Sequence, residues 1–487
     1  MTVLSEKKMR VKKSLTMLLL VCVLLFTGIV PAFAADAPKI RAESFLLADM
    51  DSGNILYEKN MNQMRSPASL TKIMTGLLAA EAVERGDISL DDVITAPSNC
   101  WDGMDLDSSN AEILPGEKMT FKDYFYCAMV KSANEACNVL AVALDGSIQA
   151  FVNRMNLRAN ELGATHTFFS DTNGLSNENH YTTAHDLFLI TLEAMKHELF
   201  AEAVDTIDYE IEETNMHAKR YLNSSNALLC QDGIYGDGYL YLPASGVKTG
   251  YTKTAGYCLV STAEKNDMRL LAVVLGCGGV SNTGEDGYGN FSATIKLYDW
   301  GFANFERKTM ASVGKVMNRA PVKYASNRVT AELRPAGNVS FLVPKDLDES
   351  RLSVDISTDA AKLVAPIAAG TVLGKAVIRI DGEQYASVKL YTADPIEADR
   401  RELLRAKAAE LLSDPKVKIA VIAVLLLIVL FLFIVIRYYA AKKRRLVEIA
   451  GLEAKRRKER EISENIEKSI IEQRKMEEFR DNLKKSE

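Results

Sequence analysis

The sequence has 487 residues, of which 48% are hydrophobic, and its formal net charge is −5. This length exceeds that of one ordinary domain, and the apolar content is enough for a sizeable core, so we expect two folded domains plus membrane segments. Residues 35–436 carry 38 Lys and Arg against 52 Asp and Glu, a net charge of −14. An acidic body repels polyphosphate, which excludes nucleic acid as a partner.

The first 34 residues have the pattern of an export signal. Five basic side chains, between Lys7 and Lys13, precede an apolar run from Leu15 to Val30. Ala32-Phe33-Ala34 then supplies the small residues that a signal peptidase requires. We expect residues 1–34 to be a cleaved signal peptide. An uncleaved anchor is the less favoured alternative, because the apolar run is short for a membrane span.

Residues 35–305 mix strand-like and helical patterns and predict an α/β domain. Helical spacing of apolar residues covers Leu70 to Glu84 and Phe121 to Lys131, in the middle of the domain. Strand patterns occur near residue 45 and return late, where Gly256–Thr262 and Met268–Leu275 predict a hairpin. These positions predict a sheet built from both ends of the domain, with helices packed beside it.

The rest of the chain predicts a small all-β domain, an amphipathic helix and a membrane span. Short alternating runs from 306 to 394 are typical of β-strands. Residues 395–416 have an apolar helical face that fits the outer membrane surface, although a plain spacer helix explains it equally well. Residues 417–436 contain the unbroken apolar run Ile419–Ile436, which predicts a transmembrane helix.

The charges after this span predict its orientation. Lys442, Lys443, Arg444 and Arg445 follow it closely, so residues 437–487 are expected in the cytoplasm and the body of the chain outside. Apolar residues at helical spacing in the tail fit a cytoplasmic partner helix, but a solvated charged helix is an open alternative. Six cysteines lie in the exported part, at loose spacings, and we expect free, buried thiols.

Ser69-Leu70-Thr71-Lys72 stands at the start of a predicted helix, directly after Pro67. A spacing of three residues places Lys72 one turn from Ser69 on the same face. A serine hydroxyl needs a base to become a nucleophile, and a buried lysine with a lowered pKa can act as that base. The motif alone is weak, because a capping serine with a solvated lysine gives the same letters.

Two further short motifs follow in the chain. Ser132-Ala133-Asn134 is predicted to lie in a loop between helices, where the hydroxyl could relay protons and the amide could hold a carbonyl. Lys248-Thr249-Gly250 begins the late strand region, followed by Tyr251, and could bind a carboxylate while the glycine permits close backbone approach. Each motif alone has a purely structural explanation.

Together, in this order, the three motifs form the set shared by penicillin-binding proteins and class A β-lactamases. The stretches Ser66–Thr75, Val247–Thr252 and Trp300-Gly301-Phe302 closely resemble the D-alanyl-D-alanine carboxypeptidases. The resemblance covers about residues 40 to 305. It implies a β-lactamase/transpeptidase-like fold, a peptidoglycan stem peptide as substrate, β-lactams as covalent inhibitors, and no cofactor or metal.

The resemblance also implies roles for the motif residues. Ser69 would be the nucleophile and Lys72 its base, while Ser132 and Asn134 would flank the cleft. Lys248 and Thr249 would bind the terminal carboxylate. Gly250 would allow close approach, and the Tyr251 N–H would be the second oxyanion donor after that of Ser69.

One departure from the family pattern concerns the substrate carboxylate. Several relatives have an arginine before the Trp-Gly-Phe corner, but here the stretch Asn290–Asp299 contains Lys296 as its only cation. Carboxylate binding would then rest on Lys248 and Thr249.

Three other functions remain possible from the sequence. A penicillin-binding sensor or scaffold would acylate once without turnover, and a D,D-transpeptidase would use an amine in place of water. A metal peptidase using His180, His185 and Asp186 is less favoured, because their spacing matches no common ligand pattern.

Overall fold

The computed structural model of the chain describes residues 37–104, 107–175, 179–230, 238–279 and 288–484. The predicted signal peptide, residues 1–34, lies outside the described residues. The chain divides into two units. The first consists of Met1–Pro321, Thr330–Leu363 and Ala368–Pro395, and the second of Val322–Val329, Val364–Ile367 and Ile396–Glu487.

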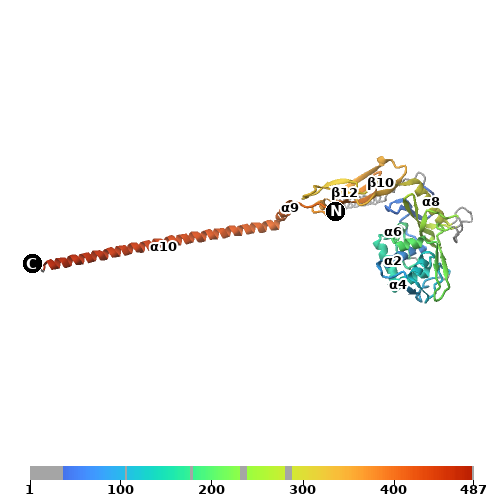
Figure 1. The fold of residues 1–487 in the computed structure, drawn as a ribbon, viewed down its shortest axis with the longest axis horizontal. Coiled ribbons are helices and arrows are strands. Elements are labelled where there is room, and N and C mark those ends of the chain that lie inside the picture. Colours follow the sequence, from blue (N-terminus) through green and yellow to red (C-terminus); the bar gives the residue numbers. More distant parts are fainter. Residues whose placement is uncertain (1–36, 105–106, 176–178, 231–237, 280–287, 485–487) are drawn as a thin grey trace, which may run out of the picture. The chain divides into compact units, whose positions relative to one another are not determined.

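An antiparallel five-stranded sheet, in the order β2-β1-β9-β8-β7, organises the larger part of the first unit (Figure 1). Two strands from the start of the domain pair with three that follow residue 243. This confirms the prediction of a sheet built from both ends of the domain. The strands are β1 (Ser44–Asp49), β2 (Ile55–Lys59), β7 (Ala244–Thr252), β8 (Gly256–Lys265) and β9 (Met268–Cys277).

Both faces of this sheet are covered by helices. Successive side chains of a strand point to opposite faces, so Leu46 and Ala48 of β1 join the core beneath the helical cluster. Phe45 and Leu47 join the opposite core, where they meet residues of α8 such as Leu297. All six residues of β1 are buried for this reason, and its sequence therefore has no polar alternation.

The helical cluster lies on one face of the sheet and α8 on the other. Helix α3 begins with a capping box, in which Thr120 and Asp123 bond each other's backbone N–H. The helices are η1 (Ala68–Thr71), α2 (Lys72–Arg85), α3 (Phe121–Met129), α4 (Asn134–Asp145), α5 (Ile148–Glu161), α6 (Ala184–Ala194), α7 (Glu198–Asp205) and α8 (Gly289–Asn304). Two short ribbons, β3 (Val93–Thr95) with β4 (Lys118–Thr120) and β5 (Asp208–Ile211) with β6 (Arg220–Asn223), complete this part.

The predicted all-β region follows α8 and is confirmed. It contains the sheet β11-β12-β16-β15-β14 and the pair β10-β13. The hairpin of β15 and β16 turns at Asp381-Gly382, where both residues have positive φ. The strands are β10 (Phe305–Ala311), β11 (Asn318–Pro321), β12 (Thr330–Pro335), β13 (Val339–Pro344), β14 (Leu352–Thr358), β15 (Val372–Ile380) and β16 (Glu383–Thr392), with the short helices η2 (Glu349–Arg351) and η3 (Ala360–Lys362).

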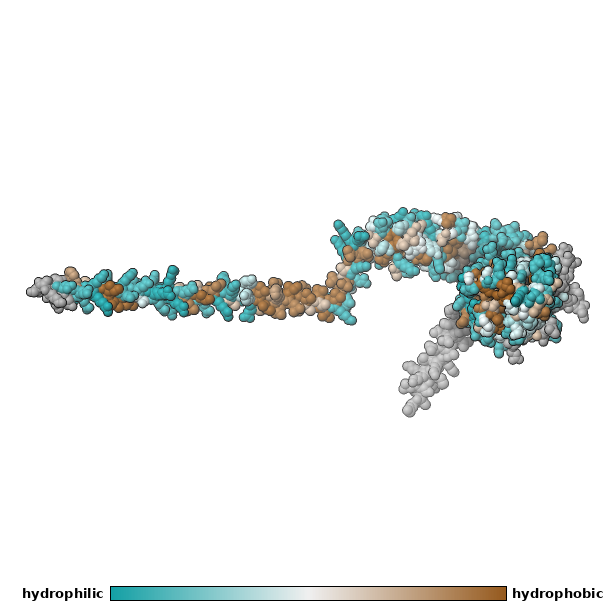
Figure 2. All heavy atoms as spheres, turned by 60° about the horizontal axis from the view of Figure 1, so that its bottom comes forward, coloured by the Kyte–Doolittle hydropathy of each residue, from teal (hydrophilic) through white to brown (hydrophobic). Residues whose placement is uncertain are grey.

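The second unit contains α9 (Arg400–Ser413) and the long helix α10 (Pro415–Lys484). Helix α9 is shorter than the predicted segment 395–416, because the Asp399 side chain caps its first turn and the helix ends before Pro415. Figure 2 shows an apolar stretch along the first part of α10 and mainly hydrophilic residues beyond it. By length and composition, α10 is the one described helix, taken singly, that could cross a membrane.

The described part of the chain contains buried thiols that form no disulfide. Cys100, Cys127, Cys137, Cys258 and Cys277 are free and buried, as the sequence predicted, whereas Cys230 is only partly buried. Burial raises the pKa of the Cys258 thiol to about 11. These side chains therefore act as small apolar core residues.

Candidate active site

A cleft of about 790 Å³ brings the three sequence motifs together between the helical cluster and the edge strand β7. Its lining includes six of the eight predicted site residues: Ser69, Ser132, Asn134, Thr249, Gly250 and Tyr251. The other two, Lys72 and Lys248, are 0% and 2% exposed and lie behind this lining. Residues up to 182 positions apart in the chain thus share one site.

Ser69 and Lys72 are joined by one turn of the 3₁₀-helix η1, in which residues three apart are eclipsed. Lys72 Nζ lies 2.9 Å from Ser69 Oγ, 2.7 Å from Asn134 Oδ1 and 2.9 Å from the carbonyl oxygen of Asn173. As an ammonium, Lys72 donates to all three oxygens. As a neutral amine, it keeps two donors for Asn134 and Asn173, and its lone pair faces Ser69 Oγ.

The surroundings of Lys72 favour its neutral form. Burial lowers the pKa of Lys72, while the charges of Cys137, Asp171 and Glu135 act in the opposite direction. Among the described residues, no carboxylate forms an ion pair with Lys72. The side chain can therefore accept a proton from Ser69 at a pH below the ordinary range of lysine.

Ser132 and Asn134 enter the cleft from the junction of α3 and α4. Ser132 occupies the predicted interhelical loop with φ of 62°, a left-handed conformation that is uncommon for serine. Asn134 is the first residue of α4, and its backbone N–H donates to the carbonyl oxygen of Ser109 at 3.0 Å. The helix start thus fixes the amide that accepts from Lys72.

Lys248 and Thr249 lie in the middle of β7, the edge strand of the sheet, rather than at the strand start that the sequence suggested. Lys248 Nζ donates to the carbonyl oxygen of Thr249 at 3.3 Å. Burial, followed by the charge of Lys72, lowers the pKa of Lys248 well below its usual value. Thr249 Oγ1 shares a hydrogen bond of 2.7 Å with Ser225 Oγ at the cleft surface.

Gly250 brings β7 against the turn that carries Ser69. A Cβ atom on this glycine would lie 3.1 Å from Ser69 N and 3.2 Å from the carbonyl oxygen of Pro67. The backbone of β7 therefore lies directly against the backbone nitrogen of Ser69. The Tyr251 ring is 52% exposed and stacks on Tyr257 at 4.4 Å.

Two parts of the site were not assigned by sequence reasoning. The loop from Asp171 to Gly174 supplies the Asn173 oxygen to Lys72, a role that the sequence motifs did not predict. Asn290, at the start of α8, lines the cleft and donates through Nδ2 to the carbonyl oxygen of Cys258 at 3.3 Å. Lys296 lines a separate hollow with Arg41, so it is not part of the cleft.

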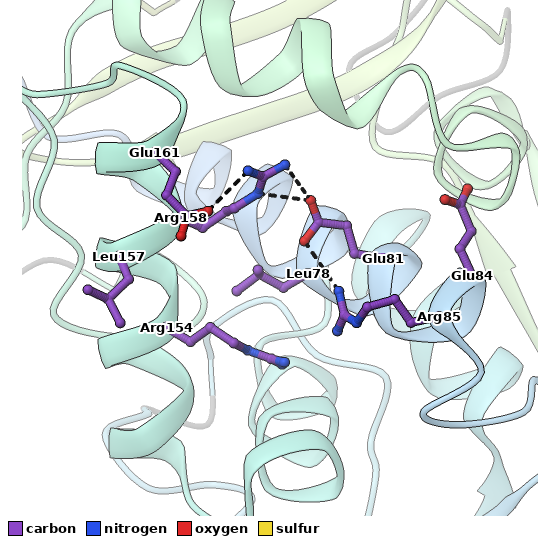
Figure 3. A pocket seen from close by; sticks show the side chains of 8 residues that line it. All are labelled: Leu78, Glu81, Glu84, Arg85, Arg154, Leu157, Arg158 and Glu161. Carbon is purple, nitrogen blue, oxygen red and sulfur yellow. Dashed lines mark hydrogen bonds and ion pairs between the residues drawn. The ribbon is translucent and has the colours of Figure 1, made fainter. Parts of the chain in front are cut away.

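A second hollow, between α2 and α5, carries charges that are largely satisfied by one another (Figure 3). Arg158 contacts Glu81 at 2.7 Å and Glu161 at 3.2 Å, and Arg85 also approaches Glu81. Glu81, Glu193 and His197 have the spacing of a metal site in the described residues, but Arg158 bridges the two carboxylates. This region is explained as an ion-pair network that joins the helices.

The histidines of the metal hypothesis do not converge in the structure. His180 is buried against Thr71, whereas His185 is 35% exposed and lies 3.8 Å from Asp186. Asp186 instead accepts from Thr167 Oγ1 at 2.7 Å and from the backbone N–H of His166 at 2.8 Å. Each of these groups has a structural partner.

Comparisons with known proteins agree with this geometry. The D-alanyl-D-alanine carboxypeptidase family matches residues 31–279, and the C-terminal domain of penicillin-binding protein 5 matches residues 305–398. The chain is 32% identical to D-alanyl-D-alanine carboxypeptidase DacF of Bacillus subtilis, over 77% of this chain and 92% of that protein. It is 30% identical to DacA of Escherichia coli, over 71% and 81% of the two chains.

Solved structures show the same relationship. Penicillin-binding protein 5 of Haemophilus influenzae superposes with a TM-score of 0.64 at 28% identity, over 75% of this chain and all of that one. Penicillin-binding protein 6B of Escherichia coli gives 0.55 at 25% identity, over 74% and 98%. The chain therefore belongs to the D-alanyl-D-alanine carboxypeptidase family of serine peptidases.

Proposed function

We propose that the protein removes the terminal D-alanine from peptidoglycan stem peptides through an acyl-enzyme on Ser69. The observation that carries this proposal is the 2.9 Å contact between Ser69 Oγ and Lys72 Nζ, an amine with no carboxylate partner among the described residues. A buried, unpaired lysine is a suitable general base for a serine nucleophile.

Neutral Lys72 takes the proton of Ser69 as Oγ attacks the carbonyl carbon of the penultimate D-alanine. The N–H groups of Ser69 and Tyr251 donate to the oxyanion that forms, and the close approach of Gly250 to the Ser69 nitrogen supports this role. The proton passes by way of Ser132 to the amine of the leaving D-alanine. Water then attacks the ester and releases the shortened peptide and free Ser69.

The remaining cleft residues bind the substrate. Asn134 holds Lys72 through its side-chain oxygen, and its NH₂ group is left for a substrate carbonyl. Thr249, with Lys248 behind it, binds the terminal carboxylate, whose negative charge favours the protonated form of Lys248, since Lys296 lies outside the cleft. A β-lactam reacts at the same Ser69 and blocks the cleft.

The arrangement of the protein in the cell is part of the proposal. Residues 1–34 direct export and are removed, 35–305 form the catalytic domain, and 306–394 form the small β domain. Helix α9 borders the outer membrane surface, and the apolar first part of α10, up to Ile436, spans the membrane. Residues 437–487 then lie in the cytoplasm, available to a partner helix. Cysteine-accessibility labelling of intact cells at a position after 437 and at one in the β domain tests this topology.

The decisive test is release of free D-alanine from a diacyl-D-Ala-D-Ala peptide by the full-length protein in detergent. Steady release in the wild type and none in Ser69→Ala is the expected result. A single acylation by labelled penicillin without D-alanine release would instead indicate a sensor. Transfer of the acyl group to an added amine faster than hydrolysis would indicate a transpeptidase.

A further inference from the structure

A buried histidine outside the cleft lining contacts the turn that carries Ser69. His180 is 3% exposed, and its Nε2 lies 2.8 Å from Thr71 Oγ1. Its Nδ1 lies 3.2 Å from the backbone nitrogen of Ser170, which donates to it. Thr71 stands between Ser69 and Lys72 in the chain, so His180 contacts the helical turn that carries both residues.

Contacts on both sides of the ring hold His180 in place. Thr71 Oγ1 donates its only hydrogen to the carbonyl oxygen of Ala68, at 2.9 Å, and so can accept from His180 Nε2. On the other side, Nδ1 accepts from the backbone N–H of Ser170 and lies 3.1 Å from Ser170 Oγ and 3.5 Å from Asp171 Oδ2. The ring thus links the Thr71 hydroxyl to the loop that begins at Ser170.

The hydrogen bonds that run from His180 through Thr71 end at Ala68, a residue with a strained backbone conformation. Ala68 has φ of 49° and directly precedes Ser69. A left-handed conformation is unfavourable for alanine and persists where surrounding contacts hold it. The Ala68 carbonyl is also packed against Gly174, where a Cβ would lie 1.8 Å from the oxygen.

The same loop that faces His180 also serves Lys72. Asp171 accepts from the backbone N–H groups of Asn173 and Gly174, at 3.0 and 2.6 Å, and Asn173 offers its carbonyl oxygen to Lys72. The contacts from His180 through Thr71 therefore fix the Ala68 carbonyl, and the loop that contains Asn173 fixes the Lys72 amine.

We propose that His180 is a positioning residue: through the Thr71 hydroxyl it holds Ala68 in its left-handed conformation and so aligns Ser69 Oγ with Lys72 Nζ. His180 does not touch the substrate. The inference rests on the proposed function of Ser69, because its effect is measured on the acylation of that residue.

The test compares paired variants of the full-length protein in detergent. Thr71→Val removes the hydroxyl at nearly constant shape, whereas Thr71→Ser keeps it. His180→Leu removes the donor, whereas His180→Gln retains an amide N–H. His185→Gln is the matched control, because His185 lies five residues further along the chain and outside the network. The readouts are kcat and KM for D-alanine release, the acylation rate with labelled penicillin, and the melting temperature.

Thr71→Val and His180→Leu are expected to lower kcat and the acylation rate about 10- to 100-fold, the cost typical of misplacing a reacting group. KM should stay within about threefold, because the substrate-binding strand is untouched. Thr71→Ser and His180→Gln should recover most of the loss. Because both residues act through one hydrogen bond, the double variant Thr71→Val, His180→Leu should be no slower than the worse single variant.

A kcat for Thr71→Val within about twofold of wild type would overturn the inference, as would losses that multiply in the double variant. Equal losses in Thr71→Ser and Thr71→Val would also contradict it. If Thr71→Val shows no melting transition, the His180→Gln and His180→Leu pair decides the question. Absence of D-alanine release by the wild type would be a failure of the proposed function, which separates the two results.

Discussion

The chemistry depends on Lys72, because its amine must be unprotonated before it can accept the proton of Ser69. Its burial, and not a charged partner, lowers the pKa. Three oxygens within 2.9 Å, those of Ser69, Asn134 and Asn173, leave the neutral amine with its lone pair towards the serine.

This environment predicts the pH dependence of catalysis. As pH rises, Lys72 loses its proton and becomes a base, so kcat/KM should increase and then level off. Because the pKa is lowered from 10.5, the midpoint should lie below that value. A profile from about pH 6 to about pH 11 checks this. A midpoint at or above the ordinary lysine value would show that burial does not activate Lys72.

Lys248 is expected to lower the stability of the folded protein although its side chain is needed for activity. Its folded-state pKa is lowered, so the unfolded chain binds more protons between the folded and unfolded pKa values, and stability rises with pH across that window. Below the window, protonated Lys248 is still desolvated in the folded state. Lys248→Met should therefore raise the melting temperature at pH 7, reduce its pH dependence, and lower kcat/KM. A lower melting temperature would indicate that the lysine stabilises the fold.

The motif residues could be predicted at this scale because each motif spans only a few positions. A spacing of three fixes Ser69 and Lys72 on one helical turn without reference to the rest of the chain. The contact between Thr71 and His180 joins residues 109 positions apart and leaves no periodic trace in the sequence. For the same reason the sequence could not predict a contact between His180 and the turn that carries Ser69.

At the scale of elements, the site is the meeting of an edge strand with a short helix. Strand β7 ends the order of the sheet, so the side away from β8 is free to face η1. Gly250 makes this approach possible, with Ser69 N 3.1 Å from where a Cβ would stand. The sequence predicted the strand and the helix but placed Lys248 at a strand start, because burial of the preceding residues depends on tertiary packing.

Gly250→Ala tests this contact. The added methyl group would press against the backbone of Ser69 and Pro67, which belong to packed elements and cannot move freely. Acylation by penicillin should fall about 10- to 100-fold, as expected for a displaced nucleophile, with a small change in melting temperature. Gly337→Ala is the matched control, since Gly337, like Gly250, lacks a positive φ, and no atom lies within 4 Å of its added Cβ. Unchanged acylation in Gly250→Ala would show that the strand approach is not required.

The whole molecule joins the peptidase fold to a second β domain and a long C-terminal helix. The sequence predicted this order because composition changes sharply at each boundary, from mixed patterns to short alternating runs and then to unbroken apolar residues. It placed the boundary between the amphipathic segment and the transmembrane helix after residue 416, whereas the break between α9 and α10 lies between Ser413 and Pro415. That break depends on Asp414 and Pro415, which end one helix and start the next.

Membrane attachment is the prediction at this scale. A chain ending after Ser413 lacks α10 and should appear in the soluble fraction, whereas the full chain should remain in the membrane pellet until detergent is added. D-Alanine release from a small soluble substrate should be similar for the two proteins. Recovery of the shortened chain in the membrane pellet would contradict anchoring by α10.

Activation of Ser69 by Lys72 can be tested by mass-spectrometric mapping of the penicillin adduct after a short incubation near neutral pH. A covalent adduct is expected on the peptide that contains Ser69, and the rate of its formation should fall at least about 100-fold in Lys72→Met. An adduct on another residue, or acylation of Lys72→Met at the wild-type rate, would contradict the central claim that buried Lys72 activates Ser69.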